Sequence, residues 1–144
     1  MKSVKQLLHS NPSRLLVSVT PDATVIQALN TMNDHNIGSV VVMDDDKLIG
    51  IFTERDYIRN VVLKGLDPIN SRIGDLPMGK VCYVTPEYTL DEVMALMTEK
   101  RIRHVPVLDH EQKVIAIVSI GDLVKSIIDE QTFEIEQLVR YITG

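Results

Sequence analysis

Two stretches of the chain carry apolar residues three and four positions apart, which is the spacing of a helix with one buried face. Polar residues fill the positions between them, so each helix is expected to pack on a core through that face. The apolar positions are Val25, Ala28, Leu29 and Met32 in the first stretch, and Leu90, Val93, Met94 and Met97 in the second. The stretches are preceded by Thr20-Pro21 and by Thr85-Pro86. The pattern predicts each threonine as the N-cap and each proline as the first helical residue.

Each helical stretch is followed by two short runs of mostly aliphatic residues. The runs cover 39–43 and 48–52 in the first case, and 104–108 and 114–118 in the second. Polar turns at 44–47 and 109–113 separate the runs, so the pattern predicts two antiparallel hairpins. The runs are nearly continuously apolar, which is typical of strands covered on both faces. Further helices are expected at 54–64, ended by Gly65, and from residue 120 to about 130.

These elements recur because the chain contains an internal repeat. The segment Val19–Thr24 returns 65 residues later as Val84–Thr89. After one inserted residue the offset becomes 66, so that Asp56 returns as Asp122. A unit of roughly 60 residues buries too little surface to be stable alone, so the two copies are expected to share a core. The boundary between two such copies offers related clefts, and clefts are where small molecules bind.

The 144 residues are therefore interpreted as one domain built from two half-domains. We assign residues 1–65 to the first repeat with an N-terminal lead-in helix, 66–80 to a linker, 81–130 to the second repeat, and 131–144 to a final amphipathic helix. Short extended lead-ins are expected at 16–19 and 81–84. The final helix is expected to cover a seam, within the chain or between chains, with its apolar residues Phe133, Ile135, Leu138, Val139 and Ile142.

Composition narrows the classes of function. Apolar residues make up 44% of the chain and charged residues 24%, which are values of globular proteins. The net charge of −5 argues against a nucleic-acid partner, because nucleic-acid binding requires a basic face. The single cysteine, Cys82, excludes an internal disulfide framework and a multi-cysteine zinc site. No apolar run approaches the length of a membrane span and no secretory signal is recognisable, so we expect a cytoplasmic protein without a metal or an obligatory cofactor.

The most suggestive chemical feature is a hydroxyl residue at the end of a strand, with an aspartate three positions later. Thr53 precedes Asp56 in the first repeat, and Ser119 precedes Asp122 in the second. One interpretation is a capping box, which stabilises the start of the following helix. The alternative is a ligand site, because the free N–H groups of a helix N-terminus suit a phosphate. The aspartate of such a site can accept both hydroxyls of a ribose. Both interpretations remain open from the residues alone.

The repeated Thr-Pro pairs, the segment Arg103-His104-Val105-Pro106-Val107 and both hydroxyl-x-x-Asp endings fall in register. Over about residues 3 to 128 the chain resembles a stand-alone pair of cystathionine-β-synthase-type (CBS) domains, also called a Bateman module. The resemblance implies an α/β (α+β) fold of two β-α-β-β-α units, related by a pseudo-twofold axis and packed through their sheets, with the C-terminal helix outside this core. It also implies a homodimer shaped as a flat disc. The implied ligand is an adenosine nucleotide (AMP, ADP, ATP or NAD(H)), bound in clefts between the repeats.

The resemblance assigns residues to each of the two clefts. One cleft takes Asp122 for the ribose, Ser119 for the phosphate or the ribose, and Arg103 and His104 for the phosphate. Ile117 lies beside the nucleoside, and the adenine is enclosed by the segment from Arg14 through Leu16 to Val17 with Ile37 and Gly38. The other cleft takes Asp56, Thr53 and Ile51, with Gly38 and Ser39 at the phosphate end, and an adenine wall made by Gly79, Lys80, Val81, Cys82 and Ile102.

The repeats differ where the phosphate is expected. The second repeat has the cationic pair Arg103 and His104, whereas the first has an uncharged pair at 38–39. The resemblance therefore predicts that the Asp122 cleft binds a phosphorylated nucleotide more tightly, with Arg55 or Lys80 as substitutes in the other cleft. His104 is also a candidate for sensing pH through a neighbouring phosphate.

Three functions are compatible with these features. The favoured one is a non-catalytic regulatory module that binds an adenosine nucleotide and signals to an unknown effector protein, since nothing else in the chain forms an output domain. The alternatives are a structural adaptor without a ligand and an enzyme acting on a nucleotide. The cleft residues include no general base paired with a nucleophile, which argues against the enzyme.

Overall fold

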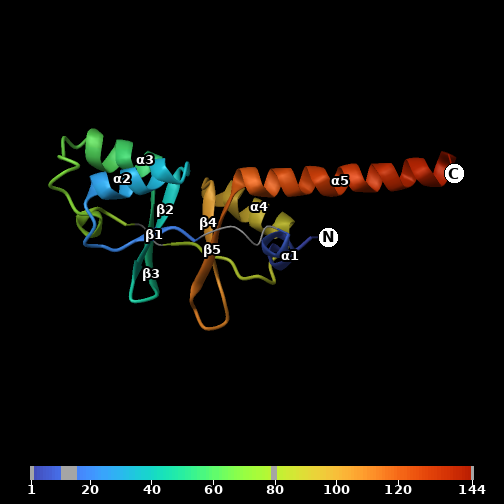
Figure 1. The fold of residues 1–144 in the computed structure, drawn as a ribbon, viewed down its shortest axis with the longest axis horizontal. Helices are drawn as coiled ribbons and strands as arrows, with labels where there is room; N and C mark the ends of the chain where they lie inside the picture. Colours follow the sequence, from blue (N-terminus) through green and yellow to red (C-terminus); the bar gives the residue numbers. More distant parts are fainter. Residues whose placement is uncertain (1, 11–15, 79–80, 144) are drawn as a thin grey trace.

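Two small sheets, one from each repeat, form the centre of the molecule (Figure 1). The computed structural model describes residues 2–10, 16–78 and 81–143. In the first repeat, β1 (Ser18–Val19), β2 (Ser39–Asp44) and β3 (Lys47–Thr53) form a sheet in that order. In the second, β4 (His104–Leu108) and β5 (Val114–Ser119) form a hairpin, and Val84 makes an isolated parallel bridge to Val107. Both predicted hairpins and the α/β (α+β) fold class are confirmed.

Helices α2 (Val25–Asp34) and α4 (Leu90–Lys100) bury the predicted apolar stripes, but they begin later than predicted. The N-caps are Thr24 and Thr89, so the prediction of N-caps at positions 20 and 85 is wrong. Each cap hydroxyl accepts the N–H of the residue three positions on, and the side chain of that residue, Gln27 or Glu92, accepts the N–H of the cap. This reciprocal box satisfies two N–H groups at the helix start, which explains why the helices begin there.

The segments that precede the two repeats are exchanged between them. Helix α1 (Val4–His9) docks on the second repeat, and the 3-10 helix η2 (Ile73–Asp75) docks on the first. In both places, N–H groups of two successive residues donate to carbonyls just before the helix of the other repeat: Val4 to Tyr88 and Lys5 to Pro86, and Ile73 to Ala23 and Gly74 to Pro21. Val4 and Ile73 are fully buried in the core that they join. Two equivalent sets of contacts therefore join the two repeats.

The second helix of each repeat begins at the predicted residue. Helix α3 (Glu54–Tyr57) continues as the π-helix η1 (Ile58–Val62), and the chain turns away at Gly65, which has a φ of +67°. In the second repeat the segments predicted at 120–130 and 131–144 form one continuous helix, α5 (Ile120–Thr143). Residues 122–143 contain neither glycine nor proline, so the sequence offers no stop between the two segments.

The far end of α5 does not cover a seam within the chain. Residues 131–143 are all exposed, and Figure 1 shows the helix extending well beyond the sheets. The expectation that this segment covers an intramolecular seam is therefore wrong. Its alternative, a seam between chains, remains a prediction.

The two repeats pack through their sheets, as predicted. A buried cluster of Val41, Leu108 and Val114, with Leu16 and Ile117 beside it, joins β2 of the first repeat to the hairpin of the second. The expectation that all four hairpin strands are covered on both faces is correct only for β2 and β4. Strands β3 and β5 alternate between buried and accessible residues, which is the pattern of strands with one face toward solvent.

Candidate functional site

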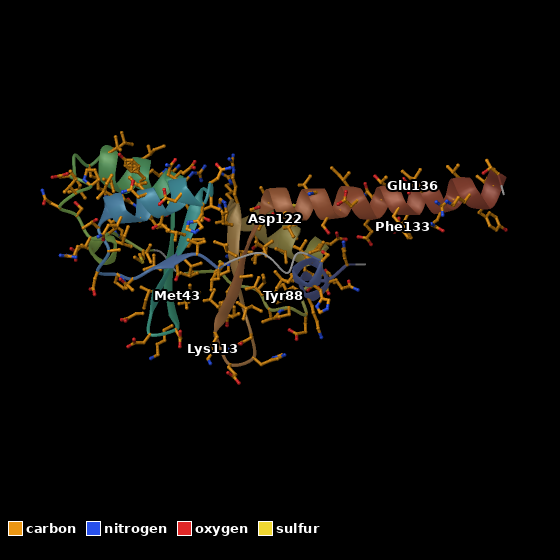
Figure 2. The ribbon with its side chains drawn as sticks, in the orientation of Figure 1. Met43, Tyr88, Lys113, Asp122, Phe133 and Glu136 are labelled. Carbon is orange, nitrogen blue, oxygen red and sulfur yellow. The ribbon has the colours of Figure 1, made fainter. Side chains whose placement is uncertain are left out.

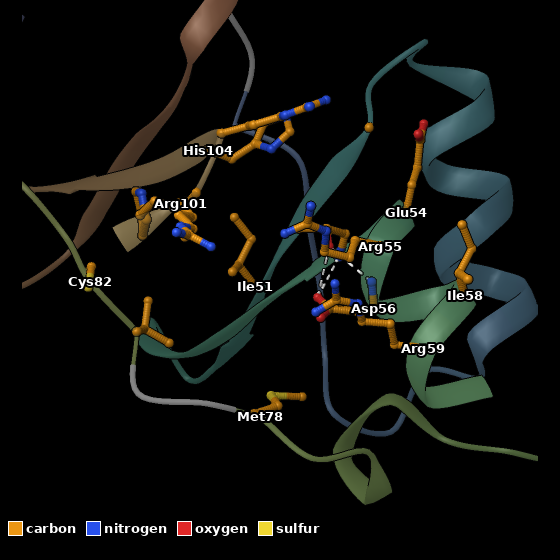
Figure 3. Close-up of a pocket in the computed structure, with 16 residues that line it drawn as sticks. Ile51, Glu54, Arg55, Asp56, Ile58, Arg59, Met78, Cys82, Arg101 and His104 are labelled. Atoms are coloured by element: carbon orange, nitrogen blue, oxygen red, sulfur yellow. Dashed lines mark hydrogen bonds between the residues drawn. The ribbon is translucent and has the colours of Figure 1, made fainter. Parts of the chain in front are cut away.

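A cavity of about 590 Å³ lies between the two repeats (Figure 3). This volume is typical of pockets that hold small molecules. One wall comes from the first repeat, where β3 passes into α3 and η1: Gly38, Ile51, Thr53, Glu54, Arg55, Asp56, Ile58 and Arg59. The other wall comes from the segment after η2 and from the start of β4: Met78, Val81, Cys82, Arg101, Ile102, Arg103, His104 and Pro106.

Asp56 is held in place by the start of α3. The N–H and the hydroxyl of Thr53 donate to Asp56 Oδ2 at 2.9 and 3.0 Å, and the N–H of Asp56 donates to Thr53 Oγ1 at 3.1 Å. The capping interpretation is therefore confirmed. It does not exclude a ligand, because all of these bonds to the carboxylate use one oxygen. Among the described residues no partner is found for Asp56 Oδ1, so this oxygen is left to accept a hydroxyl in the cavity.

The equivalent box in the second repeat has the same geometry. The N–H and the hydroxyl of Ser119 donate to Asp122 Oδ2 at 2.9 and 2.7 Å, and the N–H of Asp122 donates to Ser119 Oγ at 3.2 Å. Asp122 does not line the 590 Å³ cavity. The wall that the resemblance gives to its own cleft includes Arg14, which lies outside the described residues.

The cavity is positively charged although the protein is acidic. Four arginines line it, against the two carboxylates of Glu54 and Asp56. In Figure 3, Ile51 lies between Arg101 on one side and Arg55 on the other. A basic cavity in a chain with a net charge of −5 attracts anions selectively, and guanidinium groups bind phosphate through paired N–H donors. The charge of the cavity therefore favours a phosphorylated ligand.

Apolar side chains also line this cavity. The side chains of Ile51, Met78, Val81 and Ile102, together with the free thiol of Cys82, provide apolar lining. A few polar groups converging on a mostly apolar cleft are typical of nucleotide-sized ligands. The arrangement can therefore hold an anionic group at the arginines and a flat apolar ring against the apolar side chains.

Burial lowers the pKa of His104, which lines the cavity at the start of β4. The carboxylates of Asp122 and Glu54 act in the opposite direction and raise it, whereas the neighbouring Arg103 lowers it further. His104 is therefore expected to be neutral at pH 7 in the absence of a ligand. His104 is therefore influenced by one carboxylate from each repeat, Glu54 of the first and Asp122 of the second.

The structure brings together about half of the residues that the sequence assigned to a site. Those that line the cavity are Gly38, Ile51, Thr53, Arg55, Asp56, Val81, Cys82, Ile102, Arg103 and His104. Those that lie elsewhere are Leu16, Val17, Ile37, Ser39, Ile117, Ser119 and Asp122, and the predicted residues Arg14, Gly79 and Lys80 lie outside the described residues. The sequence assigned Arg103 and His104 to the Asp122 cleft. In the structure both residues line the Asp56 cavity.

Sequence reasoning missed six lining residues: Glu54, Ile58, Arg59, Met78, Arg101 and Pro106. A signal existed for Arg59, because it follows Arg55 by four residues, and residues at this spacing share a helix face. No comparable signal existed for Met78, which reaches the cavity only because η2 docks on the first repeat.

Comparison with protein families tests the resemblance to CBS domains that the repeats suggested. The family model "CBS domain" matches residues 4–63 and 73–129. The chain belongs to the CBS domain family. The two matches correspond to the two repeats of the structure, so the prediction of a tandem pair of CBS domains is confirmed.

Individual relatives agree with this assignment. The CBS domain-containing protein CBSX3, mitochondrial, of Arabidopsis thaliana is 39% identical over 130 residues, covering 87% of this chain but 63% of its own length. The chain thus spans less than two thirds of that relative. A solved structure of a protein with CBS domains from Burkholderia ambifaria MC40-6 has a TM-score of 0.84 and 45% identity, covering 90% of this chain and 96% of its own. The structure of CBSX2 in complex with AMP shares the fold at a TM-score of 0.72 and 22% identity, covering 91% and 99% of the two chains.

Over residues 2–10, 16–78 and 81–143, no group of three or more His, Cys, Asp or Glu side chains is placed to hold a metal ion. In the same part of the chain, no helix has the length and apolar character needed to cross a membrane. A cytoplasmic location remains a prediction from the sequence.

Proposed function

We propose that this CBS domain pair is a non-catalytic regulatory module that binds an adenosine nucleotide in the cavity beside Asp56. The observation that carries the proposal is the open Oδ1 of Asp56, held by a capping box and faced by a basic wall from the other repeat. AMP, ADP, ATP and NAD(H) all combine a ribose diol, a phosphate and an adenine. CBSX2, a protein of the same fold, has been solved with AMP.

Each part of such a nucleotide has a matching region of the cavity. The ribose diol donates to Asp56 Oδ1, which is fixed before the ligand arrives, so little ordering cost is added on binding. The phosphate lies among the arginines at the start of α3 and β4. The adenine lies between Ile51 and Ile102, with Val81 and Cys82 at its edge.

We propose the reverse of the order of affinities expected from the sequence. That expectation rested on Arg103 and His104 serving the Asp122 cleft alone, and the structure places both in the lining of the Asp56 cavity. We therefore propose the Asp56 cavity as the tighter site. The two carboxylates are held by equivalent boxes, so the difference arises from the arginines rather than from the aspartates.

The output of the module is proposed to pass to other protein chains. Ligand in the cavity contacts both repeats, so binding favours one angle between them over another. The module is proposed to act as a homodimer that presents this change to a separate effector protein. The available energy is limited to the difference in ligand affinity between the two arrangements.

A thermal unfolding panel tests the ligand. AMP, ADP, ATP, NAD⁺ and NADH are compared with GMP and GTP, and unfolding is followed by circular dichroism. An adenosine nucleotide present at 100 times its Kd stabilises the protein by about 2.7 kcal/mol. The proposal would be overturned if no adenosine nucleotide raised the unfolding temperature more than the guanosine nucleotides do. The favoured function would then be a structural adaptor without a ligand.

Replacing Arg101 by asparagine is expected to weaken AMP binding without a loss of stability. Arg101 ends α4 in the left-handed conformation, with φ 56° and ψ 43°, and Asn36 holds the equivalent position of the first repeat with φ 52°. Asparagine tolerates this conformation better than arginine, so unfolding free energy should stay equal or rise by up to about 1 kcal/mol. The lost charge is exposed, so calorimetry should show up to about fivefold weaker binding. A fall in both quantities would mean that Arg101 supports the fold rather than the ligand.

AMP binding is expected to tighten as the pH falls, through His104. A phosphate nearby raises the pKa that burial lowers in the free protein, so binding takes up a proton and becomes stronger as the pH falls through the raised pKa. Each unit by which the phosphate raises this pKa gives about tenfold tighter binding at low pH. AMP itself titrates in this range, so titrations at pH 5.5 to 8 are compared with His104→Asn, which retains only the AMP contribution. Parallel pH profiles for the two proteins would exclude His104 as the sensor.

A further inference from the structure

The carboxylate of Glu54 lines the proposed nucleotide cavity but takes no part in the capping box beside it. Glu54 is the first residue of α3, and its side chain is exposed. Figure 3 shows Glu54 and Asp56 leaving the start of α3 in different directions. In the described part of the chain, neither a hydrogen bond nor an ion pair is found for the Glu54 carboxylate. Its charge is therefore left to act on a ligand that enters the cavity.

Gly38 leaves room for this carboxylate. The N–H of Glu54 donates to the carbonyl of Gly38 at 3.1 Å, which joins the start of α3 to the residue before β2. A Cβ at position 38 would lie 3.3 Å from Glu54 Oε1, which is closer than most contacts of a Cβ. A larger residue at position 38 would therefore have to shift the carboxylate, whereas glycine allows it to lie beside the backbone.

The second repeat carries different side chains at the equivalent positions. The N–H of Ile120 donates to the carbonyl of Arg103 at 2.9 Å, which is the same backbone contact at the helix start that Asp122 marks in Figure 2. Ile120 therefore corresponds to Glu54, and Arg103 corresponds to Gly38. Since the second repeat makes this contact without the acid and without the glycine, the fold requires neither. The pair in the first repeat is thus explained better by the cavity than by the fold.

Glu54 acts at the end of the cavity where the phosphate is proposed to bind. Its charge raises the pKa of His104, which begins β4. In the proposed complex the phosphate lies among the arginines at the starts of α3 and β4. Glu54 and a phosphate carry charges of the same sign, so each phosphate added to a ligand meets further repulsion from this carboxylate.

The charge of the cavity limits how many phosphates it can neutralise. In its described wall, four arginines and two carboxylates leave a surplus of two positive charges. AMP carries about two negative charges, ADP about three and ATP about four when their phosphates are fully ionised. AMP therefore neutralises the described wall. Each further phosphate places a charge near Glu54 that no cation of this wall compensates, which is unfavourable in a cavity partly shielded from water.

We infer that Glu54 is a specificity-determining residue, which makes the cavity favour adenosine monophosphate over the diphosphate and the triphosphate. The inference rests on the proposed function and adds to it the class of nucleotide. Because the repulsion grows with the charge of the ligand, removal of the carboxylate should favour ATP more than AMP.

Glu54→Gln tests the inference, because it removes the charge and retains the size of the side chain. Asp91→Asn is the matched control, since Asp91 is an exposed acid in the first turn of α4 and does not line the cavity. Titration calorimetry of the full-length proteins gives the Kd of AMP, ADP and ATP, and circular dichroism verifies the fold. A chelator keeps ATP free of divalent cations. A pH of about 8 keeps the phosphates ionised and His104 neutral.

The wild type and Asp91→Asn are expected to bind AMP at least about fivefold more tightly than ATP, with ADP between them. In Glu54→Gln the ratio of the ATP Kd to the AMP Kd should fall at least about fivefold, equivalent to about 1 kcal/mol, mainly through tighter binding of ATP. The inference would be overturned by a wild type that binds ATP as tightly as AMP, by an unchanged ratio in Glu54→Gln, or by an equal fall in Asp91→Asn. Each of these results would leave the proposed function intact. Absence of binding by all three nucleotides would instead overturn the proposed function, and the inference with it.

Discussion

Replacing Asp56 by alanine is expected to weaken AMP binding about 10- to 150-fold. A hydrogen bond to a charged group contributes about 1.5 to 3 kcal/mol, and each 1.4 kcal/mol is tenfold in affinity. The open oxygen of Asp56 is the only carboxylate oxygen in the described wall that is both fixed by a capping box and without a partner. Titration calorimetry of the full chain with AMP measures the loss directly.

The repeat supplies a matched control for this prediction. Asp122→Ala removes the same capping box from the second repeat, so it controls for the loss of a helix cap. The affinity of the tighter site should change by less than about threefold in Asp122→Ala, since Asp122 does not line the cavity. Asp56→Asn, which retains the side-chain size and removes the charge, should also bind AMP more weakly.

Two outcomes would count against the proposed site. If Asp56→Ala binds AMP as the wild type does, the carboxylate is only a helix cap and the ligand, if any, binds elsewhere. If Asp122→Ala alone causes the large loss, the order of affinities expected from the sequence is correct and the proposed order is wrong.

Most of the fold could be predicted because its signals are local. The helical stripe that ends at Met32 and the hairpin turns depend on residues close in sequence, and both were found at the predicted places. The helix starts were misplaced because Thr20-Pro21 and Thr24-x-x-Gln27 are both plausible starts, and only the second forms a reciprocal box. The carbonyls of Pro21 and Ala23 instead accept the N–H groups of the exchanged segment, a contact that no local pattern reveals.

The site was less predictable than the fold, because part of it depends on contacts between segments that are distant in sequence. Most of the wall around Asp56 comes from residues close in sequence, so the motif identified Thr53 and Asp56, although Glu54, Ile58 and Arg59 were missed. The opposite wall depends on how the repeats are rotated against each other, which decides whether Arg103 faces one cleft or the other. Arg101 reaches the cavity from a left-handed helix end, a conformation that its residue type does not suggest.

The exchange of segments leads to the prediction with the largest effect on stability. Ile73→Ala is expected to lower the free energy of unfolding by about 2 to 5 kcal/mol, the usual cost of removing a large buried side chain. Ile73 is fully buried among residues of the first repeat, such as Val25 and Ala28, although it precedes the second repeat in sequence. Because a domain of this size has a total stability of about 5 to 15 kcal/mol, the loss is a large fraction of the whole.

The loss should be shared by both repeats. Ile73 lies between them in the chain and α1 makes the equivalent contact in the other direction, so neither half retains its core when one exchange is weakened. Hydrogen exchange should therefore show protection falling together in β2–β3 and in β4–β5, while Asp75→Ala, an exposed change in the same short helix, stays within about 0.5 kcal/mol of the wild type. Protection lost only in β2–β3 would show that the halves unfold separately. In that case the exchanged segments would be linkers rather than the contacts that make one cooperative unit, and a nucleotide could not use them to couple the two repeats.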